Sequence, residues 1–321
     1  MKRKRYASLI GLLFVTTSGF GQGLAVDSSF TYSFTPLSVA HHKRVLIDIY
    51  HPTIFKGRTN PYEDKVMLDI LTADKFSVAF TEEPLLYAHL KKQGDILVIA
   101  GLPNQAHLLS ADDPNKTTLW KSPLSSQEVE GITKWVFEGG SLLLFMSHFP
   151  SGSGGKPLLE ALSVKFRDGY AYHPDHPGLT PTTLCSWFTM TRQNGLIRPA
   201  HPLLRQQKDP NLQVKTVKWL CGATVFRNPE DVILSYPPRT VLYTPEVGRD
   251  VRSFAETSDQ YAGMIGFAYG KGRVVVCADQ GQFRNNLFKN KDRTVYVTIN
   301  DPQADNAALL ISTMRWLGQI N

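Results

Sequence analysis

Residues 124–150 constrain the fold more than any other part of this sequence. Ser125 and Glu128 have the spacing of a capping box, and apolar residues follow at helical intervals. Gly139 and Gly140 then end the predicted helix. Residues 141–147 are apolar almost throughout, which is typical of a central parallel strand that is covered on both faces. The stretch therefore predicts a capped helix followed by a buried strand.

Strand and helix signals alternate on the amino-terminal side of this unit. Residues 43–50, 76–81 and 95–100 have the composition of strands, and helices are predicted from Pro61 onward and over residues 83–92. This alternation is typical of an α/β protein with a doubly wound, mostly parallel sheet of the flavodoxin-like kind. The sequence thus predicts that polar residues at the strand ends share one edge of a sheet.

The carboxyl-terminal half is richer in extended segments. Residues 163–244 favour irregular chain and further strands, and residues 264–278 form a hairpin pattern around Gly270 and Gly272. A last helix is predicted over residues 305–317, capped by the acid Asp305. We expect one domain over residues 43–321 with β-rich elaborations in its second half.

The amino terminus has the pattern of a secretory signal peptide over residues 1–22. A basic start precedes a short apolar run and then small residues. An uncleaved membrane anchor is the alternative. Removal of the four basic residues at the start lowers the formal net charge from +7 to +3, so nucleic-acid binding has little support. Residues 23–42 are predicted to be a flexible leader or an added edge strand.

The three cysteines fall into two groups. Cys277 lies inside an apolar run and is predicted to be a buried core thiol. Cys185 and Cys221 are able to pair in an oxidising compartment, but two buried free thiols would give the same pattern.

Several stretches together resemble the class I glutamine amidotransferase-like fold. More narrowly, they resemble its non-amidotransferase branches, which include bacterial domains of unknown function and relatives in gliding, transport and intraflagellar transport proteins. The resemblance covers roughly residues 43–320 and implies a fold more than an activity. The stretches that carry it are Ala100-Gly101, the helix and glycines of 124–140, His201-Pro202-Leu203, residues 270–283 and the closing Trp316-Leu317.

The resemblance argues against glutaminase activity. The family's enzymes carry a cysteine between close glycines at the turn after the central strand, and a His and a Glu at a later strand end. Here the corresponding turn is Phe-Met-Ser-His-Phe over 145–149, and Cys-Ala-Asp-Gln follows Val276. The cysteine and the His-x-Glu pair are therefore both missing.

Ser147 is the one residue that could replace the missing thiol, because a serine at a strand end can be activated by a nearby base. His148 adjoins it, but neighbours at a strand end tend to point to opposite sides. His51 or His201 would be the more plausible base, with Asp279 to orient it. The alternative is that Ser147 only ends the strand and caps the next turn.

A loop with two histidines offers candidate metal ligands. His173, Asp175 and His176 are acceptable zinc ligand types. Two prolines stiffen this loop, and no HExxH or CxxC motif supports a metal site. An exposed loop without a metal is the alternative, and no cofactor is predicted.

Polar residues gather at the predicted strand ends, where a small polar ligand would bind. Aromatic faces beside carboxylates and amides suit a sugar. The alternative is that Asp48 and Asp279 only cap neighbouring backbone groups. The candidate ligand-binding residues are Asp48, Tyr50, His51, Gly101, Ser147, His148, Asp279 and Gln280.

Together these patterns favour a secreted or periplasmic module without amidotransferase chemistry. We expect it to bind a small polar ligand, with carbohydrate as the first candidate, or to assemble with an envelope protein. We predict no transmembrane span in the mature chain. A hydrolase that uses Ser147 or a histidine in the same crevice is the alternative function.

Overall fold

The structure of the chain is a computed structural model. The predicted signal peptide, the start of the helix predicted from Pro61, and both Cys185 and Cys221 lie outside the residues that it describes. The described residues are 24–38, 42–53, 65–104, 121–148, 153–176, 178, 186–205, 209–220, 222–243, 255–257, 262–289 and 294–320.

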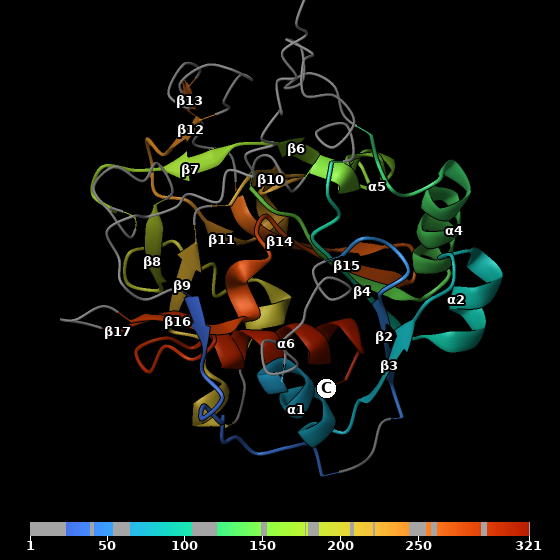
Figure 1. Cartoon of the computed structure of the whole chain (residues 1–321), viewed down its shortest axis with the longest axis horizontal. Helices are drawn as coiled ribbons and strands as arrows, with labels where there is room; N and C mark the ends of the chain where they lie inside the picture. Colours follow the sequence, from blue (N-terminus) through green and yellow to red (C-terminus); the bar gives the residue numbers. More distant parts are fainter. Residues whose placement is uncertain are drawn as a thin grey trace, which may run out of the picture.

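A nine-stranded mixed sheet forms the centre of the molecule (Figure 1). The first five strands in spatial order are parallel, and the others pair antiparallel. The predicted α/β class with mostly parallel central strands is confirmed. In spatial order the strands are β3 (Ser77–Thr81), β2 (Arg44–Asp48), β4 (Ile96–Ala100), β5 (Ser141–Phe145), β15 (Gly272–Cys277), β14 (Ala262–Tyr269), β10 (Thr224–Phe226) and β6 (Lys165–Arg167), while β11 (Val232–Ser235) also pairs with β14.

Helices cover both faces of the parallel part of the sheet. Helix α1 packs against α6 on one side, and α2 packs against α4 on the other (Figure 1). Strands β4 and β5 are buried at every position for this reason, which explains their uninterrupted apolar sequences. None of the described helices has the length and apolarity to cross a bilayer. The helices are α1 (Lys65–Ala73), α2 (Tyr87–Gln93), α4 (Ser126–Phe137), α5 (Lys156–Ala161) and α6 (Asn306–Leu317).

The unit formed by α4 and β5 agrees with its sequence pattern. The Ser125 side chain accepts a hydrogen bond from the Glu128 backbone N–H, and the Glu128 carboxylate accepts one from the Ser125 N–H. The predicted capping box is therefore confirmed. After the helix, Trp135 covers the backbone of Gly140 so closely that a Cβ there would lie 2.2 Å from the indole ring. A glycine is needed at this position because of that close approach.

Replacement of Ser125 by Ala tests the cap. We expect the free energy of unfolding to fall by about 1 kcal/mol, because the Glu128 N–H loses its hydrogen-bond acceptor. Urea denaturation of the full chain measures the change. Ser126→Ala is the matched control, since Ser126 is exposed in the first turn and the change should stay within about 0.5 kcal/mol. Equal losses in the two variants would contradict the capping role.

The β14 to β15 hairpin is also confirmed. The pair Tyr269 and Gly272 closes it, and Gly270 in the turn has a φ of +60°. Cys277 at the end of β15 is a fully buried free thiol, as predicted, and burial raises its pKa.

The expected cap of the last helix is wrong. Asp305 stands at the N-cap position of α6, but its side chain makes no capping hydrogen bond. Its Oδ2 instead accepts hydrogen bonds from the backbone N–H groups of Lys215 and Thr216, each at 2.8 Å. The carboxylate thus joins α6 to strand β9 (Thr216–Leu220).

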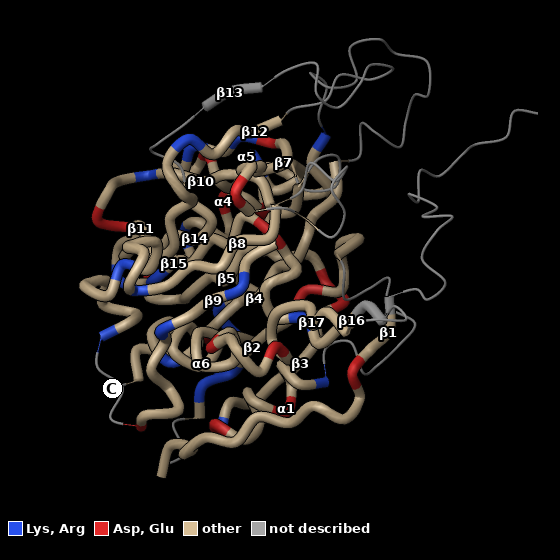
Figure 2. The backbone as a smooth tube through the Cα atoms, turned by 90° about the vertical axis from the view of Figure 1, so that its left-hand side faces the viewer, with Lys and Arg blue, Asp and Glu red and all other residues tan. Residues whose placement is uncertain are grey.

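Smaller sheets surround the central one and make up most of the β-rich elaboration (Figure 1). The amino-terminal strand β1 (Leu24–Val26) pairs antiparallel with β16 (Figure 2), and Phe30, Tyr32 and Phe34 beyond it pack against the core. The other strands of these sheets are β16 (Asn285–Lys289) and β17 (Thr294–Thr298), β7 (Tyr170–Tyr172), β12 (Val241–Tyr243) and β13 (Ala255–Thr257), and β8 (Trp187–Thr191), which pairs with β9.

Candidate functional site

The candidate site lies along the carboxyl ends of the parallel strands. Gly101 follows β4 directly, Ser147 lies two residues after β5, and Asp279 lies two residues after β15. Asp48 is the last residue of β2. The strands run in parallel register, so these ends share one edge of the sheet. Ligands of open α/β sheets bind at this edge.

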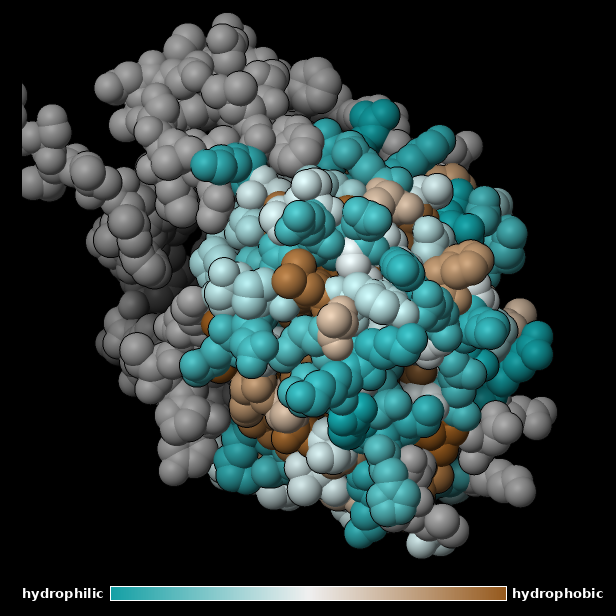
Figure 3. Space-filling model, turned by 90° about the vertical axis from the view of Figure 1, so that its right-hand side faces the viewer, coloured by the Kyte–Doolittle hydropathy of each residue, from teal (hydrophilic) through white to brown (hydrophobic). Residues whose placement is uncertain are grey.

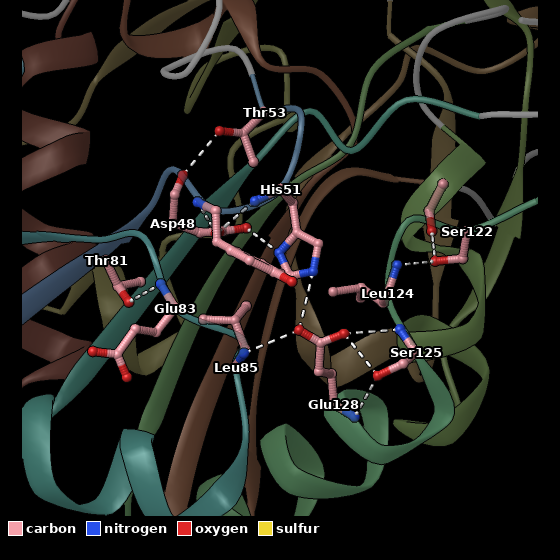
Figure 4. Close-up of polar contacts among 12 residues, drawn as sticks. Asp48, His51, Thr53, Thr81, Glu83, Leu85, Ser122, Leu124, Ser125 and Glu128 are labelled. Atoms are coloured by element: carbon pink, nitrogen blue, oxygen red, sulfur yellow. Dashed lines mark hydrogen bonds and ion pairs between the residues drawn. The ribbon is translucent and has the colours of Figure 1, made fainter.

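At one end of the edge, His51 lies between two carboxylates (Figure 4). Its Nδ1 is 2.9 Å from Oδ2 of Asp48, and its Nε2 is 3.1 Å from Oε1 of Glu128. All three residues are buried, with exposed fractions of 4% or less. The contact between His51 Nε2 and Glu128 Oε1 is short enough for an ion pair, but its geometry is not that of a hydrogen bond. The ring therefore joins the end of β2 to the first turn of α4.

The Asp48 carboxylate is occupied within the chain. Its Oδ1 accepts hydrogen bonds from the backbone N–H groups of Tyr50 and His51, at 3.0 and 3.2 Å. The Thr53 hydroxyl donates to the Asp48 carbonyl oxygen at 2.8 Å. These contacts shape the turn after β2 and leave the Tyr50 side chain 41% exposed at the surface. These contacts are those of a residue that caps neighbouring backbone groups, which is the alternative that the sequence left open for Asp48.

Glu128 holds three elements together. Besides His51, it accepts hydrogen bonds from the backbone N–H groups of Leu85 at 3.0 Å and Ser125 at 2.9 Å (Figure 4). Burial acts to raise the pKa of Glu128, but these hydrogen bonds and the nearby His51 outweigh it, so the pKa lies below its usual value. The carboxylate is therefore held in its ionised form.

Ser147 is buried, with 1% of its surface exposed. Its Oγ makes no hydrogen bond with any residue in the described part of the chain. No described histidine is thus within hydrogen-bond reach of this hydroxyl, and a nucleophile needs such a base. The described contacts give Ser147 no activating partner.

His148 instead faces two carboxyl groups. Its ring stacks on Tyr170 with the ring centroids 5.2 Å apart, and its proximity acts to lower the pKa of both Asp168 and Asp279. Burial raises the pKa of Asp168 to about 6, against hydrogen bonds from Ser153 and Gly169 that lower it. Burial likewise raises the pKa of Asp279, against the His148 ring and the Gly281 N–H. The structure thus groups a histidine with two carboxyls that resist ionisation.

Asp279 and Gln280 supply further polar atoms near the end of β15. Oδ1 of Asp279 accepts a hydrogen bond from the Gly281 N–H at 2.6 Å. Its Oδ2 and Oε1 of Gln280 have no hydrogen-bond partner among the described residues. Gly101, which follows β4, has a φ of +65° and donates its N–H to the Phe145 carbonyl oxygen. Its role in the structure is to turn the chain away from the edge.

His201 lies apart from this edge. Its Nε2 is 2.9 Å from the carbonyl oxygen of Gly266 in β14, and its Nδ1 accepts a hydrogen bond from the Leu203 N–H at 3.1 Å. Burial lowers its pKa. Both ring nitrogens hold the chain together, so neither is placed to act as a base for Ser147.

The candidate metal ligands also have other partners. His173 Nδ1 accepts a hydrogen bond from the Asp175 N–H, and its Nε2 lies 3.2 Å from the Pro238 carbonyl oxygen. The His173 and His176 rings meet edge to face at 5.3 Å, and burial lowers the pKa of His176. Among the described residues, no group of three His, Cys, Asp or Glu side chains is arranged to hold a metal ion.

Three members of the site escaped sequence analysis. Glu128 was recognised only as a cap, because its contact with His51 depends on how α4 packs beside β2. Asp168 stands in a two-residue connection between β6 and β7, and Tyr170 begins β7. The only local signal for Asp168 was its place before Gly169 in a turn between short strands.

The fold resembles solved structures of low sequence identity. The mmIFT52 N-terminal domain matches with a TM-score of 0.52 and 12% identity over 85% of this chain and 96% of that one. A putative ThuA-like protein from Bacteroides uniformis matches with a TM-score of 0.47 and 10% identity over 89% of this chain and 95% of that one. Another from Parabacteroides merdae matches with a TM-score of 0.39 and 13% identity over 88% of this chain and 90% of that one. No family model and no curated protein matches the chain. The first likeness agrees with the predicted relation to intraflagellar transport domains at the level of fold alone.

Proposed function

We propose that this protein is a non-catalytic domain that binds a small polar ligand at the carboxyl edge of its parallel strands. One observation carries the proposal. Ser147 Oγ and Gln280 Oε1 follow neighbouring strands, and neither has a hydrogen-bond partner among the described residues, while the adjacent Asp279 carboxyl is held by the backbone N–H groups of Gly281 and His148. A buried polar group without a partner costs about 1–3 kcal/mol, so such groups need a reason to persist. A ligand rich in hydroxyl groups would satisfy them.

The order of the parallel strands supports this location. In chain order they are β2, β3, β4, β5 and β15. In space the order is β3, β2, β4, β5, β15, so the second strand of the chain lies at the outer edge, beside the first. This is the flavodoxin-like order, and we infer that the chain belongs with class I glutamine amidotransferase-like folds, in a branch without amidotransferase chemistry. Ligands of such sheets bind beyond the strand carboxyl ends, near the point where the strand order reverses. Here that point lies between β2 and β4, on the same edge of the sheet as the residues after β5 and β15 but nearer to Asp48 and His51 than to them.

Aromatic side chains near the edge favour carbohydrate as the ligand. Tyr170 is half-buried beside the His148 ring, and Tyr172 and Tyr243 on neighbouring strands have ring centroids 5.7 Å apart. Aromatic faces cover the apolar side of a sugar, while carboxylates and amides bind its hydroxyl groups. The combination supports a sugar or another polyol over an apolar ligand.

A hydrolase is the second candidate, and one observation favours it. Asp168 and Asp279 both have pKa values that burial raises, and the nearby His148 acts to lower both. Perturbed carboxyls beside a histidine in one cluster are typical of acid and base catalysts. In this hypothesis His148, rather than Ser147, would carry the chemistry.

Assembly with an envelope protein is the third hypothesis. The exposed large apolar residues of the described chain are Tyr50, Phe80, Leu86 and Phe137. On the face that carries α2 and α4, apolar residues are scattered among hydrophilic ones and form no broad patch (Figure 3). Single exposed apolar residues are normal on soluble proteins, so this face gives little support to a large interface. Secretion or a periplasmic location remains our proposal from the sequence.

Saturation-transfer NMR with a panel of neutral mono- and disaccharides tests the binding proposal. We expect at least one sugar to bind and His148→Ala to weaken it about tenfold or more, because the variant loses both a ring face and a polar partner. Phe137→Ala is the matched control. Phe137 is an exposed aromatic residue at the end of α4, which leads into the amino-terminal end of β5 and so lies at the opposite edge of the sheet from the proposed site; its loss should leave binding unchanged.

Cleavage assays separate the two candidate functions. Chromogenic esters and glycosides offered to the same protein should remain intact if the domain only binds. Turnover that His148→Ala and Asp168→Asn abolish would replace the binding proposal by the hydrolase. A complete lack of sugar binding together with a lack of turnover would leave the carbohydrate proposal without support and overturn it.

A further inference from the structure

A cavity lies at the amino-terminal end of β15, at the opposite edge of the central sheet from the proposed site. It has a volume of about 690 Å³ and is bounded by residues 35–38, by the 3-10 turn Pro202–Leu204 and by the carboxyl-terminal part of α6. Arg273, near the start of β15, lines it. Arg273 and Asp279 are six positions apart along β15 and its continuation, a span of about 20 Å. The cavity is therefore distinct from the carboxyl-edge site.

The amino-terminal segment forms one wall of this cavity and is fixed at both ends. The Thr35 N–H donates to Oδ2 of Asp209 at 2.8 Å, and the Leu37 N–H donates to Oδ1 of Asp74 at 3.2 Å. Asp74 is in turn bound through both oxygens by Arg315 of α6, at 2.6 and 2.8 Å. Arg315 also donates to the Thr35 carbonyl oxygen. The wall is thus held in place without any ligand.

Two arginines in the cavity are not neutralised. Three arginines and one acid line the cavity. Arg315 is paired with Asp74, and the Asp209 carboxylate accepts hydrogen bonds from the backbone N–H groups of Thr35 and Asn211. Arg205 and Arg273 form no ion pair with a described carboxylate. Arg273 is held in position, because it donates to the Trp316 carbonyl oxygen at 2.5 Å and lies 5.0 Å from the centre of the Trp316 ring. The cavity therefore favours a negatively charged occupant.

The cavity also has a buried hydroxyl and apolar surface. Ser312 lines it with 1% of its surface exposed, and its Oγ has no hydrogen-bond partner among the described residues. Leu203 and Ile320 provide apolar contacts beside the half-buried Trp316. A fixed guanidinium, an unpaired buried hydroxyl and an aromatic wall together match a ligand with one anionic group and one flat apolar body.

We propose that this cavity is a binding site for a small aryl anion, with a carboxylate or phosphate group held by Arg205 and Arg273. The Ser312 hydroxyl donates a hydrogen bond to the bound ligand. The aryl ring packs between Trp316 and the aliphatic residues of the wall. Carboxylate and phosphate share the same recognition chemistry, since guanidinium groups bind both through paired N–H donors.

Fluorine NMR of the full chain tests the proposal with three matched probes. These are 4-fluorobenzoate, 4-fluorophenyl phosphate and the neutral 4-fluorobenzyl alcohol. We expect the fluorine signal of one or both anions to broaden and shift on addition of protein, while the signal of the alcohol stays unchanged. Arg205→Gln should weaken anion binding about tenfold, because it removes a charge-assisted contact, and Ser312→Ala about fivefold.

Arg198→Gln is the matched control for charge. Arg198 is exposed like Arg205 and has one described hydrogen bond, to Ser235, but it does not line the cavity. The proposal is overturned if neither anion binds, if the alcohol binds as tightly as the anions, or if both arginine variants weaken binding equally. Loss of binding in His148→Ala together with unchanged binding in Arg205→Gln would also overturn it, because the anion would then occupy the carboxyl-edge site.

Discussion

Replacing His51 with Ala is expected to lower the free energy of unfolding by roughly 3–5 kcal/mol at neutral pH. The imidazole lies between the carboxylates of Asp48 and Glu128, at 2.9 and 3.1 Å, and all three groups are buried. Without the ring, two buried acidic groups lose the partner that they share. Leaving such charges uncompensated costs far more than the loss of a surface ion pair.

The loss should depend on pH in a defined direction. In the wild-type protein His51 helps to lower the pKa of Glu128, so this carboxylate contributes stability above its ordinary pKa and loses it as the pH falls through the lowered value. In His51→Ala the Glu128 carboxyl loses the neighbour that helps to lower its pKa, so it takes up a proton more readily than in the wild-type protein. Protonation removes the repulsion between it and the Asp48 carboxylate, so the difference from wild type should shrink as the pH falls toward about 4.

Urea denaturation over this pH range measures the effect, with His89→Ala as the matched control. His89 Nδ1 lies 3.1 Å from Oε2 of Glu83, but the Glu83 side chain is 71% exposed. Water screens that pair, which contributes no more than about 1 kcal/mol. The other ring nitrogen, Nε2, is 2.9 Å from the Thr81 hydroxyl, and the loss of that hydrogen bond adds about 1 kcal/mol, so the total loss should stay below the one expected for His51→Ala. Equal losses in the two variants would show that His51 is no more than a packing residue.

The same network shows what the sequence was able to predict. Asp48 and His51 were predicted to stand at a strand end because the apolar run of β2 stops there. Glu128 was predicted as a capping residue from its spacing to Ser125. Both predictions use local periodicity, which packing of the sheet preserves. Their meeting is a contact between segments about 80 residues apart, and periodicity carries no information about it.

Residues outside regular patterns were harder to assign. His201 was a candidate base because of its chemistry, yet its ring is used to fix a short turn against β14. Asp168 was not a candidate, since it stands between two three-residue strands with weak periodicity. Its importance comes from burial beside His148, which depends on how the second half of the chain folds back over the parallel sheet.

Asp168→Asn is expected to stabilise the protein at neutral pH. The pKa of Asp168 is raised to about 6 from its ordinary value of 3.8, so the folded protein binds a proton there that the unfolded chain has lost. Stability therefore falls as the pH rises from about 4 to about 6, and the full penalty is present above the folded pKa. The shift corresponds to at most about 3 kcal/mol.

Asparagine keeps the size and one acceptor oxygen of the side chain but carries no charge. We expect the variant to gain about 1–3 kcal/mol in free energy of unfolding at pH 7, and to match wild type below about pH 4, where the unfolded-state carboxyl is also protonated. Urea denaturation across this range measures the gain. Asp69→Asn is the control, because Asp69 is 56% exposed on α1 and its replacement should give no comparable gain.

A stability gain together with lost ligand binding would have a direct explanation. A charged group that lowers the stability of the free protein can be retained because ligand binding needs it. Its removal then raises the free energy of unfolding and weakens binding. Asp168→Asn should accordingly weaken sugar binding while His148 stays in place. If the variant is less stable than wild type at neutral pH, the carboxylate is instead ionised and satisfied in the fold, and Asp168 then belongs to the structure of the β6 to β7 turn rather than to the site.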